Sequence, residues 1–263
     1  MEPPISTYCE RLPMAALAGH VLCVWSQVIG AGASLHRHRV LPDGCADLVW
    51  IGEAPAVVAG PATGPVTVPL APRTVVVGVR LRPGAAAVLG PPVSALSNRD
   101  TPLRDLWGAD LLSGRIAEQG SIEARLAAAE ATLATRLADA EPPDRGIVAA
   151  TRWLARHPTG RIEDLASLLD TGPRQLHRRF VAAVGYGPKT LQRVLRLQRV
   201  LALAARSSES LAALAAGAGY ADQAHMSREV RVLTGQSPRV LLQGAKSTLA
   251  LSDLFKTGAA PGG

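Results

Sequence analysis

The stretch GYADQAHMSREVRVLTGQSP, residues 219–238, has a degraded copy in TGPRQLHRRFVAAVGYGP, residues 171–188. An offset of fifty residues keeps the two copies in register; the matched pairs are Leu176 and Met226, Arg178 and Arg228, Phe180 and Val230, Gly185 and Gly235, Pro188 and Pro238, and Leu191 and Leu241. A short amphipathic run precedes each copy, RIEDLASLLD (161–170) and ESLAALAAGA (209–218), so each copy predicts a helix, a tight turn and a second helix. Two copies are too few for a solenoid, and the repeat therefore indicates a duplicated functional unit.

The bulk properties are those of a globular protein with room for two domains. The chain has 263 residues, 48% of them hydrophobic and 19% charged. It has no apolar run of the about 18 to 20 residues that a membrane-spanning helix needs. The N-terminus, MEPPISTYCERLP, does not resemble a secretory signal, and three widely spaced cysteines (Cys9, Cys23 and Cys45) argue against a disulfide framework. We therefore expect a cytoplasmic protein with no membrane partner.

The excess positive charge lies in the duplicated region. Residues 1–144 hold 11 basic and 14 acidic side chains, whereas residues 145–243 hold 15 and 6, a net charge of +9. Such a contrast suggests a polyanion as partner of the second half only. On charge alone a well-solvated, Arg-rich surface remains the alternative.

Helical periodicity separates an inner face from an outer face in both copies. The inner positions are Leu176, Phe180, Ala183 and Val184 in the first copy, and Met226, Val230 and Leu233 in the second. The outer positions are Arg174, Gln175 and Arg178, and then Ala224, His225 and Arg228. An outward Arg recurs at the same place, and the planar fork of Arg matches the two acceptors on the major-groove edge of guanine.

The segment KTLQRVLRLQRVLALAAR, residues 189–206, predicts a long connecting helix, because it has a broad apolar face and contains no Gly or Pro. A rigid connection could hold two recognition helices one turn of DNA apart, roughly 34 Å. One chain could then read two successive major-groove segments.

Taken together, residues 145–243 resemble the DNA-binding domain of the AraC/XylS family of bacterial transcription regulators. The resemblance rests on four features: LHRRF (176–180), the Gly-x-x-Pro motifs at 185–188 and 235–238, the Arg-Leu-x5-Leu motif that begins at Arg196, and GYADQAHMSREV (219–230). The chain departs from the family pattern at Val230, where an aromatic residue is usual, and at Gly172, where the turn normally holds Ser.

The resemblance implies a promoter or operator in double-stranded DNA as partner, with RNA polymerase as a further one, and neither cofactor nor catalytic residues. The implied base contacts are Arg174, Gln175, His177, Arg178, Gln223, Ala224, His225 and Arg228. The expected phosphate contacts are Arg179, Lys189, Thr190, Arg193, Arg231 and Arg239.

The first hundred residues predict a β-rich domain, so the fold class is α+β. Close-spaced strand-like runs cover 20–29, 34–40, 46–52, 65–70 and 73–82, a pattern typical of a barrel or sandwich. Two helical stretches follow at 103–119 and 121–140; the second has an apolar seam that could dimerise or pack back on its own barrel, formed by Ile122, Leu126, Ala129, Leu133 and Leu137. The expected divisions are 1–100, the helical linker or dimerisation region 101–140, the linker 141–146, the DNA-binding domain 145–243 and a flexible tail 244–263.

Two further segments, RVLPDGCADLVW (39–50) and GVRLRPGAAAVLG (78–90), resemble an N-terminal domain that is fused to this DNA-binding domain in bacterial regulators. That resemblance implies a sensor for a small-molecule effector. LPDG (41–44) is first of all a tight turn between strands. The functional interpretation gathers an effector pocket from Trp25, His36, His38, Asp43, Cys45, Asp47, Trp50, Arg80 and Arg82.

Two alternatives stay open beside an effector-responsive regulator that could be a homodimer. One is a metal- or thiol-responsive regulator that uses Cys45, His36 and His38, although their spacing matches no strong zinc signature and we expect no metal. The other is a DNA-modifying enzyme that the two helix-turn-helix units direct to DNA. The sequence, however, has no nucleophile elbow, phosphate loop or dinucleotide fingerprint.

Overall fold

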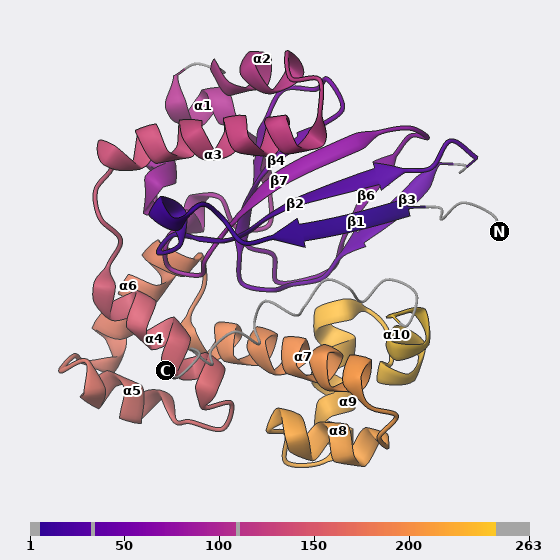
Figure 1. Ribbon diagram of the computed structural model, residues 1–263. Helices are drawn as coiled ribbons and strands as arrows, with labels where there is room; N and C mark the ends of the chain where they lie inside the picture. The colour runs from indigo at the N-terminus through magenta and orange to yellow at the C-terminus, as the bar shows by residue number, and fades with distance from the viewer. Residues whose placement is uncertain (1–5, 33–34, 109–110, 246–263) are drawn as a thin grey trace, which may run out of the picture.

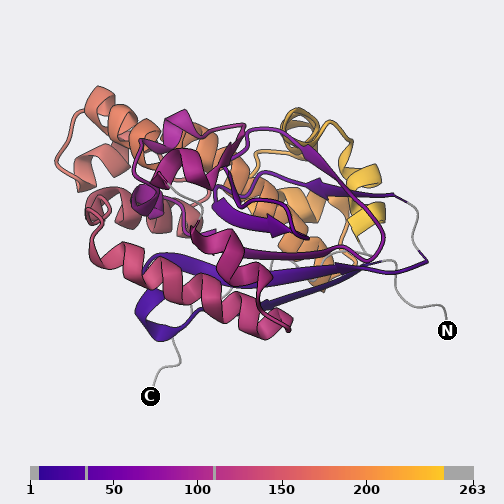
Figure 2. The same ribbon diagram turned by 90° about the horizontal axis from the view of Figure 1, so that it is seen from above.

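A computed structural model describes residues 6–32, 35–108 and 111–245 of the chain. The predicted tail lies outside the described residues from position 246 onward. The chain is α+β, with a β-rich N-terminal half and an all-helical C-terminal half, as predicted (Figure 1). The sheet lies between helices α1 to α3 on one side and the C-terminal helices on the other, and the view from above shows α3 running along the sheet (Figure 2).

The large sheet has six antiparallel strands in the order β1-β2-β7-β4-β5-β8. Their bounds are β1 (Ser6–Arg11), β2 (Val21–Ile29), β4 (Ala46–Ile51), β5 (Val57–Ala59), β7 (Val75–Leu81) and β8 (Asp100–Pro102). A separate antiparallel hairpin pairs β3 (His36–Val40) with β6 (Val66–Leu70). Leu70 of this hairpin packs with Trp25 and Val76 of the large sheet, so the hairpin covers one sheet face.

All five predicted strand runs correspond to strands of the structure, namely β2, β3, β4, β6 and β7. These runs are rich in Val, the residue type that best fits a pleated, half-buried surface. The short strands β1, β5 and β8 were not predicted. STYCER is mostly polar, and VVA and DTP are only three residues long, so none of them has a clear strand pattern.

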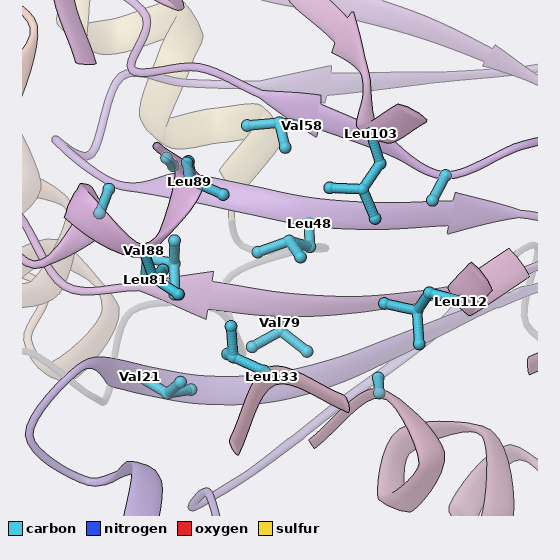
Figure 3. Packing of buried hydrophobic residues seen from close by; sticks show 14 of the residues in the cluster. Val21, Leu48, Val58, Val79, Leu81, Val88, Leu89, Leu103, Leu112 and Leu133 are labelled. Atoms are coloured by element: carbon cyan, nitrogen blue, oxygen red, sulfur yellow. The ribbon is translucent and has the colours of Figure 1, made fainter. Parts of the chain in front are cut away.

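Three helices cover the other face of the large sheet: α1 (Leu103–Trp107), α2 (Leu111–Ala117) and α3 (Ile122–Ala138). Figure 3 shows Leu133 close to Val21 and Val79 of the sheet. Leu126 and Leu133 are buried within this core, so the apolar seam of α3 packs back on its own sheet instead of standing free for a partner.

The C-terminal half consists of α4 (Arg145–Arg156), α5 (Ile162–Leu168), α6 (Pro173–Val184), α7 (Pro188–Arg206), α8 (Leu211–Ala218), α9 (Gln223–Thr234) and α10 (Pro238–Ala245). The pairs α5–α6 and α8–α9 are the two helix-turn-helix units, and α7 is the predicted uninterrupted connection between them (Figure 1). Gly185 and Gly235 end α6 and α9 with φ of +96° and +69°, a left-handed conformation that favours glycine. Within the described ranges, no helix is long and apolar enough to cross a membrane.

Candidate nucleic-acid interface

The first unit presents its polar face on α6. Pro173 begins the helix, where its missing N–H is one that would have no intrahelical partner in any case. The inner face is closed, since Leu176 and Phe180 are each 0% exposed. The opposite face is exposed and carries all four predicted base-contacting side chains of this unit: Arg174, Gln175, His177 and Arg178.

The second unit repeats this arrangement on α9. Asp222 caps the helix, because its Oδ1 accepts a hydrogen bond of 2.6 Å from the backbone N–H of His225. Met226 and Val230 are both fully buried on the inner face. Of the predicted base contacts, Gln223, Ala224 and Arg228 are exposed and His225 is half-buried.

We call α6 and α9, the exposed helices of the two units, the two readers. A carboxylate joins the second reader, α9, to the connecting helix α7. Glu229 of α9 accepts hydrogen bonds from Arg193 Nε at 3.1 Å and from Arg196 Nη2 at 2.8 Å, both on α7. Its carboxylate also lies 3.5 Å from Nε2 of His225, whose ring stands edge-on to Tyr220. The network fixes α9 against α7, and it engages Arg193, which we predicted as a phosphate contact.

The remaining predicted phosphate contacts differ in their exposure and in whether they already form ion pairs. Three are exposed with no carboxylate partner among the described residues: Lys189, Arg231 and Arg239. Thr190 is half-buried in the first turn of α7. Arg179 donates two hydrogen bonds of 2.8 Å to Asp144, which caps α4, and these bonds hold the pKa of Asp144 below its usual range.

The N-terminal half contacts both readers at their C-terminal ends. Ser97 Oγ donates a hydrogen bond of 3.0 Å to the carbonyl of Gly185, the residue that ends α6. The Arg39 guanidinium donates to the carbonyl of Thr234, the last residue of α9. The two contacts fall at almost equivalent positions of the repeat.

The segment 41–44 also joins the two halves. It connects β3 to β4, which lie in different sheets, so LPDG joins two strands that do not pair with each other. Leu41 packs against the helical core, and the Pro42 carbonyl accepts a hydrogen bond of 2.6 Å from Gln198 of α7. A Cβ on Gly44 would lie 2.8 Å from Leu191 Cδ1 of α7, and the φ of +87° at this residue also favours glycine. We call these residues the 41–44 bridge.

The predicted effector residues divide between two sides of the large sheet. Trp25, Asp47 and Arg80 lie on the face covered by the hairpin; Trp25 Nε1 donates to Asp47 at 2.9 Å, and Arg80 Nε lies 3.1 Å from the same carboxylate. His38 reaches this region from the hairpin, with Nδ1 3.2 Å from Gln27 Nε2. Asp43 joins from the bridge, 3.4 Å from Arg80.

The other four predicted residues are His36, Cys45, Trp50 and Arg82; of these, Cys45 lies beside the site, because its backbone N–H donates a hydrogen bond of 2.9 Å to Asp43 Oδ1. Trp50 packs in the core on the opposite face, because successive strand residues alternate in direction and Asp47 and Trp50 are three apart. Arg82 lies beyond the end of β7 and donates to the Ala18 carbonyl. His36 lies on the same strand side as His38, and the two ring centroids are 6.1 Å apart.

Cys45 is buried, and burial raises the pKa of its thiol, which disfavours the thiolate that a thiol sensor needs. All three cysteines are free. In the part of the chain that the structure describes, no group of three or more His, Cys, Asp or Glu side chains could hold a metal ion.

Two family models match the chain. Residues 165–244 match a helix-turn-helix domain, and residues 10–102 match a domain of unknown function, DUF6597. The chain carries an AraC-type helix-turn-helix domain. This domain supports a DNA-binding transcription regulator of the AraC family. Regulators of this family are transcription factors rather than enzymes.

Solved structures of another such regulator, ToxT from Vibrio cholerae, are similar to the chain. One at 1.65 Å resolution has 12% sequence identity, covers 90% of this chain and 98% of its own, and gives a TM-score of 0.46. A structure of ToxT bound to an unsaturated fatty acid has 12% identity, covers 80% of this chain and 91% of its own, and gives a TM-score of 0.42. No curated protein sequence matches the chain.

Several residues that shape the AraC-type domain and its attachment were not predicted from the sequence. Glu229 is one, although an acid inside a basic recognition helix is a visible signal. Gln198 and Tyr186 are buried on the side of the helical half that meets the 41–44 bridge. Glu10 lies on the unpredicted strand β1, 3.6 Å from Arg80.

Proposed function

We propose that this regulator reads two successive segments of the major groove with α6 and α9 of a single chain, in response to a small molecule bound by its N-terminal half. The observation that carries the proposal is the repeated polar face. Each reader is buried on one side and exposes an Arg at the matched position, Arg178 or Arg228. The uninterrupted helix α7 and the Glu229 network hold the two readers in one rigid unit.

The exposed side chains suit base edges. Arg178 and Arg228 could each take the two acceptors of guanine, and Gln175 and Gln223 could pair with adenine. Ala224 offers only an apolar contact with a thymine methyl group. His225 is held by Tyr220 and Glu229, so it would meet DNA in a preset orientation.

The phosphate contacts would come first from the exposed cations Lys189, Arg231 and Arg239. Lys189 lies in the first turn of α7, where the partial positive charge of the helix N-terminus adds to its own. Arg179 and Arg193 would contribute as parts of ion pairs, because each is already bonded to a carboxylate. These contacts position the protein on DNA and carry no sequence information.

The effector role rests on the way the halves meet. A buried polar cluster in the N-terminal half includes Asp43, which belongs to the 41–44 bridge, and this bridge packs on α7 between the two readers. A ligand that moved the bridge would therefore act on the readers directly. We further propose that the protein acts in the cytoplasm of a bacterium and is not an enzyme; RNA polymerase and a second copy of the chain remain predicted partners.

Selection of binding sites from random duplex DNA by the full-length protein tests this function. We expect enrichment of two short sequence elements about 10 base pairs apart, centre to centre. The variants Arg178→Ala and Arg228→Ala should each erase one element and keep the other. Enrichment of a single element, or binding with no sequence preference, would contradict the proposal.

A further inference from the structure

Gln175 of α6 and His225 of α9 stand at matched positions of the two readers, because an offset of fifty residues keeps the units in register. Gln175 is exposed, and its amide forms no hydrogen bond within the described part of the chain. His225 is different, since its side chain is only 31% exposed and contacts three neighbouring groups of the protein. The same position therefore has a free polar group in one reader and an engaged one in the other.

Both ring nitrogens of His225 face groups of the protein. Nδ1 accepts a hydrogen bond of 3.4 Å from the backbone N–H of Ala221, in the turn before α9. A neutral imidazole whose Nδ1 accepts carries its proton on Nε2, and this atom lies 3.5 Å from Oε1 of Glu229, one helical turn further along α9. A base edge would have to displace one of these partners, because the ring has no other polar atom.

Tyr220 packs against the same ring. The two ring centroids are 5.3 Å apart, and the ring planes stand at 86° to each other, a favourable edge-to-face geometry. Tyr220 is itself buried, and the guanidinium of Arg196 of α7 lies 5.0 Å from its ring centroid. His225 therefore connects α9 to the turn of its own unit and, through Tyr220, to the connecting helix.

Glu229 is the residue to which these contacts converge. Its side chain is only 14% exposed. Its carboxylate lies near three groups, namely Arg193 Nε at 3.1 Å, Arg196 Nη2 at 2.8 Å and His225 Nε2 at 3.5 Å. The matched residue of the first unit is Arg179, which is bonded to Asp144 before α4. The first unit thus has a cation where the second has a carboxylate, so Glu229 has no counterpart beside Gln175.

We propose that His225 positions the second reader and reads no base, so that of the two matched residues only Gln175 discriminates between base pairs. The proposal rests on the two-reader function proposed above and divides its specificity unequally. At the preceding matched position the first reader has Arg174 and the second has Ala224, which offers no polar group. The first element should therefore have more specified base pairs than the second.

The same contacts set the position of α9 relative to α6. His225 and Glu229 connect α9 to the turn and to α7, and α7 runs without interruption from the first unit to the second. A variant that loses either side chain should let α9 settle at more than one angle in the groove. Binding should then weaken for all sequences alike, and the separation between the two elements should matter less.

The affinity of the full-length protein for a selected operator and for all its single base-pair substitutions tests the assignment. Gln175→Ala should lower the discrimination at one base pair of the first element about ten-fold. His225→Ala should weaken every operator of the set by one common factor, about five-fold, the cost of a lost hydrogen bond. Loss of discrimination at any base pair of the second element in His225→Ala overturns the proposal, as does an unchanged affinity.

Operators with one base pair inserted or removed between the elements separate positioning from a general loss of stability. In the wild type this change should weaken binding about ten-fold or more, whereas in His225→Ala and Glu229→Ala the penalty should be at least about three-fold smaller. Val230→Ala, which destabilises the same unit from its core, is the control and should keep the wild-type penalty. Equal penalties in all four proteins overturn the positioning role. If Glu229→Ala does not fold, the result for His225→Ala decides.

Failure of this inference and failure of the two-reader function give different results. If the wild type selects two elements and His225→Ala changes the base preference in the second, the two-reader function stands and His225 is a base contact. If the wild type selects a single element or none, the two-reader function itself is wrong and this inference falls with it.

Discussion

The two helix-turn-helix units share one register but are stabilised by different interactions. The first has Phe180 at the centre of its core and Gly172 before α6, with no side-chain cap. The second has the smaller Val230 at the matching position and a cap from Asp222. The units thus share one outward Arg, Arg178 or Arg228, whereas their inner packing and their capping differ.

The two units also differ in the ion pairs that hold their readers in place. Arg179 of the first unit pairs with Asp144 at the start of the helical half, and Glu229 of the second is held by α7. Each reader therefore has its own anchor, and a change in one unit should leave the other in place.

The largest difference should come from the matched core positions. Phe180→Ala should lower the free energy of unfolding by about 3–5 kcal/mol, because it leaves a large cavity. Val230→Ala removes less volume and should cost about 2 kcal/mol. Urea unfolding of both variants measures the difference. Equal losses would mean that the first core relaxes around the cavity.

The outward arginines should have smaller and equal effects on DNA affinity. Arg178→Ala and Arg228→Ala should each weaken binding to a selected site by about 1–3 kcal/mol and relax specificity in one element only. Lys189→Ala is the matched control, since a phosphate contact weakens all sequences alike and lowers the salt slope by about 1. Loss of specificity in both elements from a single Arg variant would refute independent reading.

Substitutions at the two helix N-caps should change the free energy of unfolding by an amount on the order of 1 kcal/mol, and in opposite directions in the two units. Asp222→Ala removes the hydrogen bond to the His225 N–H and should cost about 0.5–2 kcal/mol. Gly172→Ser should stabilise the first unit by a few tenths of a kcal/mol, because the extended backbone at Gly172 is that of a cap and no atom lies within 4 Å of the added Cβ. Thermal unfolding measures both, and a destabilised Gly172→Ser variant would show that the turn requires glycine.

The smallest expected effect is a pH dependence confined to the first unit. The Arg179 hydrogen bonds depress the pKa of Asp144, so the pair contributes stability that is fully present above the ordinary Asp pKa, about 3.9, and is lost as pH falls through the lower folded value. Removing the partner in Arg179→Leu should flatten this acid limb. A wild-type and a variant stability curve with the same slope below pH 4 would contradict the assignment.

The sequence predicted what local pattern determines. The Val-rich strands, the uninterrupted helix α7 and the two reading faces all follow from periodicity and residue type within about twenty positions. The exposure of Arg178 and Arg228 follows in the same way, because an outward position on a helix is set by its neighbours at three and four residues.

Contacts between distant segments could not be predicted in this way. Arg193 was expected at a phosphate, but its partner Glu229 is 36 positions away. Pro42 of the 41–44 bridge is bonded to Gln198 across 156 positions, so a segment that predicts a local turn is also one of the contacts between the halves. Trp50 was placed in the pocket, and only the strand register shows that it points to the opposite face.

We propose that one chain reads two neighbouring DNA elements at a fixed separation. The most direct measurement is the affinity for a selected operator before and after insertion of base pairs between its elements. Because α7 fixes the readers, insertions of five and of ten base pairs should both weaken binding at least about 100-fold. Recovery of full affinity with the ten-base-pair insertion would show that the elements are read by two flexibly connected units or by two chains, and would contradict the claim.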